Sequence, residues 1–309
     1  MNTENLWNVQ AIRMGYFPNM KYSQIKKLDP GEKDREVDVP AWTTLLQSNG
    51  KNILIDLGIC DPIIGSMIFN CKRDKSDYQE EALKLAAGIT PEDIDYVIFT
   101  HLHWDHMGDT LRAFKKAKFV VQKEQWNFML NCRDDQEIFY HTSRIICQDK
   151  AISPDRWVFV AGKTQLLPGI TLIPTPGHSP AHQCVLIDTV KDSKLMVLGD
   201  AANTKYIVEN KVLSGVVNNK EAYINSLNLI ETLADCVIGG HEIDGLVPFQ
   251  KTNFPKLNKP KNLGQGDLVK FRSNALHYFR NTGNSKLIFT STSHKSCGNE
   301  DLNFQEAAV

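Results

Sequence analysis

A short cluster of histidines and one aspartate, placed directly after an apolar segment, constrains this chain more than any other feature. The apolar segment from Tyr96 to Phe99 is typical of a buried strand. Residues 100–106 then read Thr-His-Leu-His-Trp-Asp-His and supply the candidate ligands His101, His103, Asp105 and His106. A strand that ends in such a cluster holds its ligands on a rigid support. The sequence therefore predicts a metal site at the end of a strand.

The ligand types indicate which metals this site would bind. Neutral imidazole and carboxylate together suit zinc or another divalent first-row metal, whereas calcium and magnesium prefer oxygen ligands. His101 and His103 are two residues apart, so in an extended chain they point the same way and can bind one ion. Asp105 and His106 then remain for a second ion. We expect two divalent metal ions, zinc first, with iron, manganese or cobalt as alternatives.

Later segments repeat the arrangement of an apolar strand followed by a candidate ligand. These later segments are Pro-Gly-His-Ser-Pro at 176–180, Gly199-Asp200 and Gly239-Gly240-His241. Before the central cluster, the apolar segment that ends in Asp56-Leu57-Gly58 has the same arrangement. With the central cluster, and in this order, they resemble the metallo-β-lactamase superfamily of hydrolases over about Thr43 to His241. The resemblance implies an α/β fold, the four-layer αββα sandwich.

The resemblance also implies a role for each candidate ligand. His101, His103 and His178 would hold one metal, Asp105, His106 and His241 the other, and Asp200 would bridge them. A hydroxide shared by the metals would attack an ester or lactone carbonyl, with Asp105 passing a proton to the departing oxygen. We expect Asp56 to orient a ligating histidine rather than to bind metal, and His182 to be structural or supporting.

Two segments, 94–106 and 176–183, are similar to the N-acyl homoserine lactone lactonase branch. That branch commonly has a tyrosine three residues after the bridging aspartate, where this chain has Asn203. Asn203 can donate a hydrogen bond from its amide but cannot act as a phenol, so Tyr206 is a second candidate for assisting at the substrate. Trp104 could line a pocket or pack beneath the site.

The metal site alone leaves several functions open, because one fold serves many substrates. Within the superfamily the alternatives are a thioester hydrolase similar to glyoxalase II, a phosphotriester or aryl-ester hydrolase and a β-lactamase. Outside the enzymes, the chain could be a metal-binding sensor or scaffold. We expect a small-molecule ester or lactone as the substrate, and a homodimer stays open.

Composition and charge exclude some partners. The 309 residues are 42% hydrophobic and 23% charged, which is ordinary for a globular protein. A formal net charge of -1 gives no electrostatic signature of nucleic acid or an acidic membrane. The first residues lack the pattern of a secretory signal, and no stretch approaches the roughly 20 apolar residues of a membrane span. The seven cysteines form no C-x-x-C pair, so we expect reduced thiols and a cytoplasmic location.

The order of patterns suggests where the domains and elements lie. We expect a hydrolase domain over residues 1–257 and a C-terminal extension over 258–309, with a helix from Asp267 to Arg280 and then a mobile tail. Further strands are expected at 9–15, where a long loop follows, and at 119–122, 157–160 and 170–173, with a hairpin turn at Asn49-Gly50. Further helices are expected before Gly88, which would end the first of them, through 111–114, from Glu124 and over 219–234.

Overall fold

The computed structural model describes residues 6–60, 70–191, 193–243, 246, 251 and 254–258, and beyond these the backbone of four further strands. The chain separates into two compact units, Met1–Leu257 and Asn258–Val309. Within the described residues, no helix has the length and apolar character needed to cross a membrane.

Two mixed β-sheets form the centre of the first unit. The first sheet has the order β1 (Asn8–Lys21), β2 (Glu36–Ser48), β3 (Lys51–Ile55), β4 (Tyr96–Ile98), β5 (Lys118–Gln122) and β6 (Trp157–Val160). The second has the order β11 (Cys236–Gly239), β10 (Lys194–Gly199), β9 (Gln183–Asp188), β8 (Ile170–Pro174) and β7 (Thr164–Leu167). Strands β3 to β6 pair in parallel, as do β10 and β11, whereas the remaining pairs are antiparallel.

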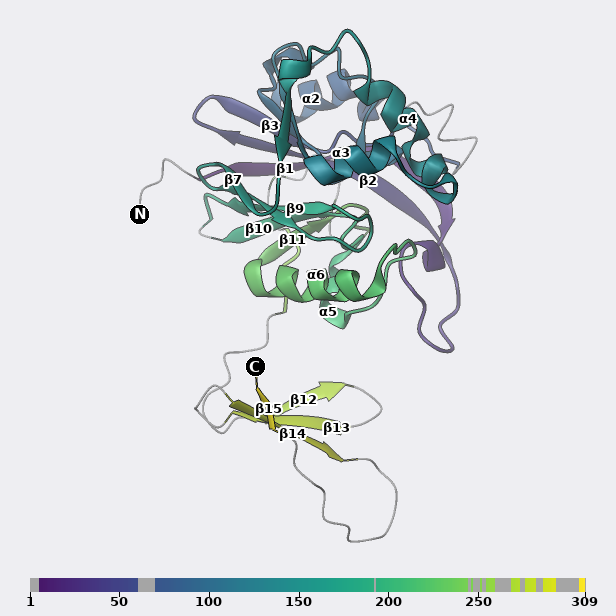
Figure 1. The fold of residues 1–309 in the computed structure, drawn as a ribbon, viewed down its shortest axis with the longest axis vertical. Helices are drawn as coiled ribbons and strands as arrows, with labels where there is room; N and C mark the ends of the chain where they lie inside the picture. Colours follow the sequence, from purple (N-terminus) through teal and green to yellow (C-terminus); the bar gives the residue numbers. More distant parts are fainter. Residues whose placement is uncertain are drawn as a thin grey trace. The chain divides into compact units, whose positions relative to one another are not determined.

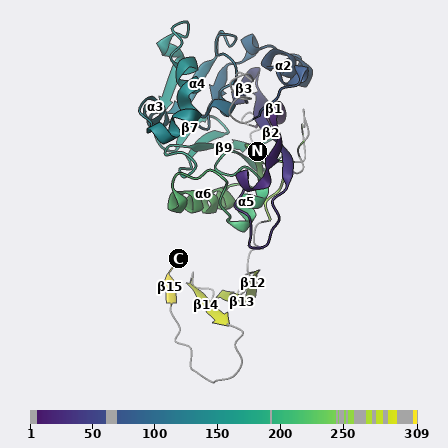
Figure 2. The same cartoon turned by 90° about the vertical axis from the view of Figure 1, so that its right-hand side faces the viewer.

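Helices cover the outer face of each sheet (Figures 1 and 2). The helices over the first sheet are α2 (Gln79–Ala87), α3 (Lys123–Leu130) and α4 (Glu137–Cys147), and those over the second are α5 (Lys205–Asn210) and α6 (Lys220–Leu233). One apolar core lies between the two sheets and includes Ile55 and Val197, and a further core lies between each sheet and its helices. The predicted four-layer αββα sandwich is confirmed.

Short 3-10 turns connect several of these elements. They are η2 (Tyr22–Gln24), η3 (Lys75–Asp77), η4 (Pro91–Asp93), η5 (Trp104–His106), η6 (Asp134–Gln136) and η7 (Pro154–Arg156). The turn η5 falls within the histidine cluster, so the ligands that follow β4 lie partly on extended backbone and partly on a tight turn.

Local signals placed several elements correctly. Asn49 and Gly50 have φ values of 49° and 73° and close the antiparallel hairpin between β2 and β3, as a tight turn requires. Gly88 ends α2 with a φ of 66°, in the left-handed region that favours glycine. Asn219 caps α6 by accepting a hydrogen bond from the Ala222 N–H at 3.0 Å.

Two other expectations about this unit are wrong. The helix expected through 111–114 is a series of turns, because tertiary burial of Leu111 and Phe114 outweighs their helical spacing. Strand β1 continues past residue 15 to Lys21, so the expected long loop is shorter. Irregularities in its pairing with β2 between Arg13 and Tyr16 and between Phe17 and Met20 allow the strand to pass Pro18.

The second unit contains four antiparallel strands in the order β12 (Leu268–Arg272), β13 (Leu276–Asn281), β14 (Lys286–Thr292) and β15 (Glu306–Ala308). The helix expected from Asp267 to Arg280 is therefore wrong. Strand pairing overrode the helical pattern there, and the aromatic and β-branched residues of the segment favour strands. The expected mobile tail begins inside β14, and residues 293–305 lie outside the described part of the chain.

A pair of glycine substitutions tests the packing around Asp56-Leu57-Gly58. Gly58 has a φ of 74°, and a Cβ there would lie 2.2 Å from Met14 Cβ. Gly50 has a φ of 73° but open space around it. We expect Gly50→Ala to lower the free energy of unfolding by about 1–2 kcal/mol through backbone strain alone, and Gly58→Ala by about 2–5 kcal/mol because overpacking adds to that strain. Urea denaturation measures both values, and equal losses would contradict the packing argument.

Candidate metal centre

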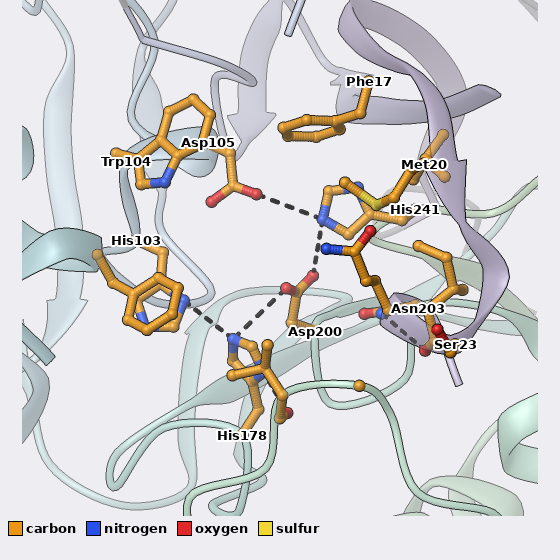
Figure 3. Close-up of a pocket in the computed structure, with 16 residues that line it drawn as sticks. Phe17, Met20, Ser23, His103, Trp104, Asp105, His178, Asp200, Asn203 and His241 are labelled. Atoms are coloured by element: carbon orange, nitrogen blue, oxygen red, sulfur yellow. Dashed lines mark hydrogen bonds and ion pairs between the residues drawn. The ribbon is translucent and has the colours of Figure 1, made fainter. Parts of the chain in front are cut away.

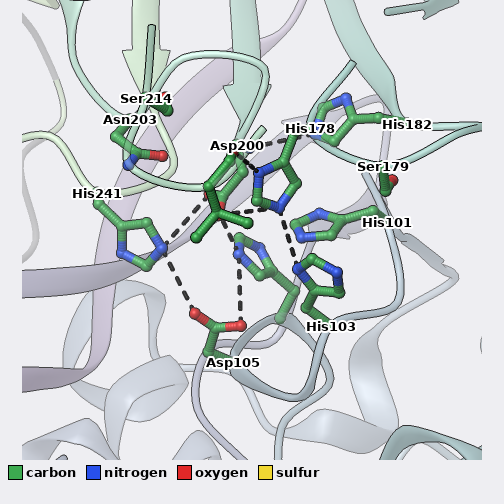
Figure 4. Close-up of polar contacts among 12 residues, drawn as sticks. His101, His103, Asp105, His178, Ser179, His182, Asp200, Asn203, Ser214 and His241 are labelled. Atoms are coloured by element: carbon green, nitrogen blue, oxygen red, sulfur yellow. Dashed lines mark hydrogen bonds and ion pairs between the residues drawn. The ribbon is translucent and has the colours of Figure 1, made fainter. Parts of the chain in front are cut away.

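The predicted ligands converge from the ends of strands that lie far apart in the sequence (Figure 4). The central cluster follows β4, His178 follows β8, Asp200 follows β10 and His241 follows β11. Their ligand atoms form three groups, each with all atoms within 4.8 Å of one another: His101 with His103 and His178, His101 with His106 and Asp200, and Asp105 with His106 and His241. The structure thus brings together every residue expected to bind metal.

Asp200 lies between the two outer groups. Its Oδ2 is 3.4 Å from His178 Nε2, whereas its Oδ1 is 3.3 Å from His106 Nε2 and 3.4 Å from His241 Nε2. Each carboxylate oxygen therefore faces a different group. This is the arrangement that a bridging ligand needs.

Gly240 allows this approach, because a Cβ at that position would lie 2.5 Å from Asp200 Oδ1. The glycine before the last histidine therefore lets the loop after β11 come close to the carboxylate at the end of β10.

Hydrogen bonds on the side that faces away from the centre fix the orientation of three imidazole rings. His178 Nδ1 lies 3.1 Å from the Val216 carbonyl oxygen, and His241 Nδ1 lies 2.8 Å from that of Pro40. His106 Nδ1 lies 2.9 Å from Asp56 Oδ2. Donation from each Nδ1 turns Nε2 toward the centre, and in the neutral imidazole that Nε2 carries no proton, which is the tautomer that a metal ligand needs.

Asp56 connects the central cluster to the end of β3 through several hydrogen bonds. Its carboxylate accepts hydrogen bonds from the Thr100 N–H at 2.8 Å and from the Thr100 hydroxyl at 2.7 Å, in addition to its contact with His106. The Thr100 hydroxyl also lies 3.0 Å from His101 Nδ1. Asp56 is buried and is in none of the three ligand groups, so its contacts agree with the expected supporting role.

The donor atoms fit a pair of divalent cations. Three buried polar atoms at the centre have no hydrogen-bond partner, namely His101 Nε2, His106 Nε2 and Asp200 Oδ1. His103 Nδ1 and His178 Nε2 lie 3.0 Å apart, so two ring nitrogens face each other. Orphaned buried polar atoms cost about 1–3 kcal/mol each, and metal coordination would supply the missing partners.

The electrostatics divide the site into two ends. Burial lowers the pKa of His101 and His103 well below the ordinary value, and repulsion from neighbouring imidazoles adds to the effect. Burial also lowers the pKa of His241, but the carboxylates of Asp200 and Asp105 outweigh it and raise that pKa to about 10. The first end therefore favours neutral imidazoles, and the second end favours positive charge.

A cavity of about 310 Å³ opens onto the centre (Figure 3). Its described lining includes the ligands His103, Asp105, His178, Asp200 and His241, and an apolar wall formed by Phe17, Met20, Ile25, Val39, Trp104, Phe139 and Val216. Apart from Trp104, the wall residues were not predicted, because apolar residues on β1, β2, α4 and the intervening loops carry no motif. Trp104 combines both expected roles, since it lines the cavity and its ring packs 5.9 Å from that of Phe17.

The remaining candidates occupy different positions. Asn203 is buried, lines the cavity and donates a hydrogen bond from Nδ2 to the Ile25 carbonyl oxygen at 3.1 Å. Tyr206 is 38% exposed and is absent from the described lining, with its ring 4.8 Å from Lys26 Nζ. His182 supports the backbone of Asp200, because its Nε2 accepts the Asp200 N–H at 3.1 Å.

Replacing Asp56 tests its supporting role. We expect Asp56→Asn to lower the affinity for one of two zinc ions by about 10–100-fold, because partners behind a ligating histidine contribute that much. Competition with a chromophoric chelator measures the affinity of each site. Asp93→Asn is the matched control, since that carboxylate also accepts from a threonine N–H and hydroxyl but lies outside the site. Equal zinc affinity in both variants would contradict the role of Asp56.

Comparisons with known proteins agree with this geometry. The family model described as "Metallo-beta-lactamase superfamily" matches residues 37–241. An N-acyl homoserine lactonase from a Bacillus species is 29% identical over 231 residues, which cover 70% of this chain and 86% of that protein. The lactonase AttM from Rhizobium radiobacter is 28% identical over 207 residues, which cover 63% of this chain and 73% of the relative.

Solved structures of lactonases are also similar to this chain. An N-acyl homoserine lactone hydrolase with N-hexanoyl-L-homoserine at its catalytic metal centre superposes with a TM-score of 0.63 and 25% identity, covering 77% of this chain and 94% of that one. The dizinc lactonase AidC, at 16% identity, shares the fold with a TM-score of 0.61, covering 94% of this chain and 96% of its own. The resemblance to the lactonase-like branch is confirmed, and the chain belongs to the metallo-beta-lactamase superfamily.

Proposed function

We propose that this chain is a dinuclear metal-dependent hydrolase that cleaves an ester or lactone of a neutral, largely apolar acyl compound. The observation that carries the proposal is the ligand set itself, in which Asp200 lies between two groups of histidines that open into an apolar cavity. The names of the relatives, N-acyl homoserine lactonases, support an ester bond within a ring as the target.

The residues divide into two metal sites with one shared ligand. His101, His103 and His178 would hold the first ion, Asp105, His106 and His241 the second, and Asp200 would contact both. Two divalent ions, zinc being best suited to this donor set, would polarise the substrate carbonyl and lower the pKa of a shared water toward about 7.

The chain's own groups supply orientation and proton transfer. Asp105 Oδ2 lies 3.5 Å from His241 Nε2, and the Asp105 carboxylate also borders the cavity. In that position it can take a proton from the attacking water and pass it to the departing oxygen. The apolar wall excludes bulk water from the acyl side, which strengthens the electrostatic interactions at the reacting carbon.

The charge of the cavity separates the candidate substrates. None of the described residues that line it is a lysine or an arginine. Glutathione thioesters and β-lactams carry carboxylates, and away from the metal ligands the described lining offers them no lysine or arginine, which makes their burial costly. The cavity therefore favours neutral esters and lactones over the thioester and β-lactam alternatives.

Metal removal tests the proposed reaction. We expect treatment of the protein with a chelator, followed by dialysis, to abolish hydrolysis of a simple lactone, and we expect added zinc to restore it. We also expect His103→Ala to lower metal content and reduce kcat/KM by more than about 100-fold, because even partners behind a ligand contribute about 10–100-fold.

His141→Ala is the control for that variant, since His141 is exposed on α4. Metal content and lactone hydrolysis are measured on the same samples. Bound metal with no hydrolysis of any ester, thioester or phosphotriester would favour the sensor or scaffold alternative instead.

A second experiment tests the neutral cavity. We compare an aryl hexanoate with the aryl monoester of adipate, which has the same chain length and a terminal carboxylate. We expect at least about tenfold lower kcat/KM for the anionic ester, because an unpaired carboxylate in the cavity costs more than the roughly 1.4 kcal/mol that corresponds to a factor of ten. Equal turnover of both esters would contradict the proposed selectivity.

A further inference from the structure

The ring of His103 is held by packing, whereas each of the other four candidate histidine ligands has a hydrogen-bond partner at Nδ1 on its outer side. His103 Nδ1 faces His178 Nε2 at 3.0 Å, and His103 Nε2 is buried without a hydrogen-bond partner among the described residues. The rings of Phe139 and Tyr140 lie against His103, with centroids 4.9 Å and 4.8 Å from its own. Both belong to α4, so the position of His103 depends on where that helix lies.

The hydroxyl of Tyr140 belongs to a chain of buried hydrogen bonds. Gln125 Nε2 donates to the Tyr140 hydroxyl oxygen at 3.2 Å, and the Ser179 hydroxyl donates to Gln125 Oε1 at 2.7 Å. All three side chains are buried, so water does not compete for these contacts. Gln125, on α3, is the middle member of the chain and uses both ends of its amide.

The same glutamine is connected to a second ligand of the first metal site. Ser179 directly follows His178 (Figure 4), so the hydrogen bond of its hydroxyl ties the turn that carries this ligand to α3. The Ser179 carbonyl oxygen also accepts the Gly177 N–H at 3.1 Å, which keeps the turn compact. Gln125 therefore supports the surroundings of His178 and of His103 at the same time.

The second metal site has different supports. Asp56 orients His106, and the Pro40 carbonyl oxygen orients His241. Within the part of the chain that the structure describes, the two side-chain hydrogen bonds of Gln125 reach neither of these ligands. A change at Gln125 should therefore affect one metal site and spare the other.

We propose that Gln125 is a positioning residue for the first metal site, where it sets the spacing of His103 and His178 through Tyr140 and Ser179. The inference rests on the proposed pair of metal ions and names the residue that prepares one of the two sites. A neutral amide suits this place, because it donates on one side and accepts on the other without adding a charge beside the cations. The spacing matters because zinc binds imidazole nitrogen at about 2.0–2.1 Å, so ligands that drift apart lose affinity.

The zinc affinity of each site, measured without substrate, tests the proposal. Gln125→Leu has a similar volume but no polar group. We expect it to weaken zinc binding at the first site by about tenfold and to leave the second site unchanged, because partners that orient a ligating histidine contribute about 10–100-fold. Competition with a chromophoric chelator measures the two dissociation constants. Anomalous diffraction from crystals equilibrated at one free zinc concentration identifies the weakened site.

Gln122→Leu is the matched control. Gln122 is also a buried glutamine, and its amide donates to Gln183 Oε1 at 2.8 Å and accepts the Gly162 N–H at 3.0 Å. We expect this variant to lower the free energy of unfolding and to keep both zinc affinities. A weakened first site in the control as well would attribute the loss to general destabilisation and would overturn the proposal.

Ser179→Ala removes the same hydrogen bond from its other end. We expect the same selective loss at the first site, and we expect the double variant Gln125→Leu, Ser179→Ala to bind zinc no more weakly than Gln125→Leu alone, because both changes break one interaction. Losses that add in the double variant would contradict a common path through Ser179. If Gln125→Leu does not fold, Ser179→Ala decides by itself.

The outcomes separate this inference from the proposed function. Unchanged zinc affinity at the first site of Gln125→Leu, or equal losses at both sites, would overturn the role of Gln125 and leave the hydrolase intact. A wild type that binds two zinc ions but hydrolyses no ester or lactone would contradict the proposed function, and the zinc affinities would still decide the role of Gln125.

Discussion

The contact of one buried carboxylate with histidines on both sides determines how the rest of the site is built. Asp200 lies within 3.4 Å of His106, His178 and His241, and all four side chains are almost completely buried. Burying a carboxylate without compensating positive charge is prohibitively costly, so this arrangement requires protonated imidazoles or metal cations beside it. The fold can keep such a group because β10 and β11 end side by side and Gly240, directly after β11, allows close approach to the carboxylate.

The second requirement is a fixed orientation of the imidazole rings, and the contacts that fix it connect the two sheets. His241 follows the second sheet but is held by the carbonyl oxygen of Pro40 on β2, and Trp42 donates from its indole N–H to the Glu242 carbonyl oxygen at 2.9 Å. On the first sheet, Asp56 at the end of β3 orients His106. Each end of the metal centre thus depends on groups from outside its own motif, so the packing of the sandwich and the geometry of the site cannot be separated.

The metal centre and the cavity wall serve different purposes. The donor atoms define a reaction class, which many proteins with this fold share. In the proposed function, the cavity wall would determine which molecule can approach, since its described residues present apolar surface and no lysine or arginine. On that proposal, substrate choice would depend on residues that carry no recognisable motif.

The sequence by itself determined the ligand types, their order and the strands that carry them, because histidine and aspartate after an apolar segment have a strong chemical meaning wherever they occur. It also placed the hairpin at Asn49-Gly50 and the cap of α6 at Asn219, whose causes lie within a few residues. The extent of β1, the turns at 111–114 and the strands at 268–281 depend on pairing and burial against distant segments, so local patterns mispredicted them. Only the tertiary structure decided the cavity wall and the direction of the Asn203 amide, because the partner that fixes it, Ile25, lies 178 residues away in the chain.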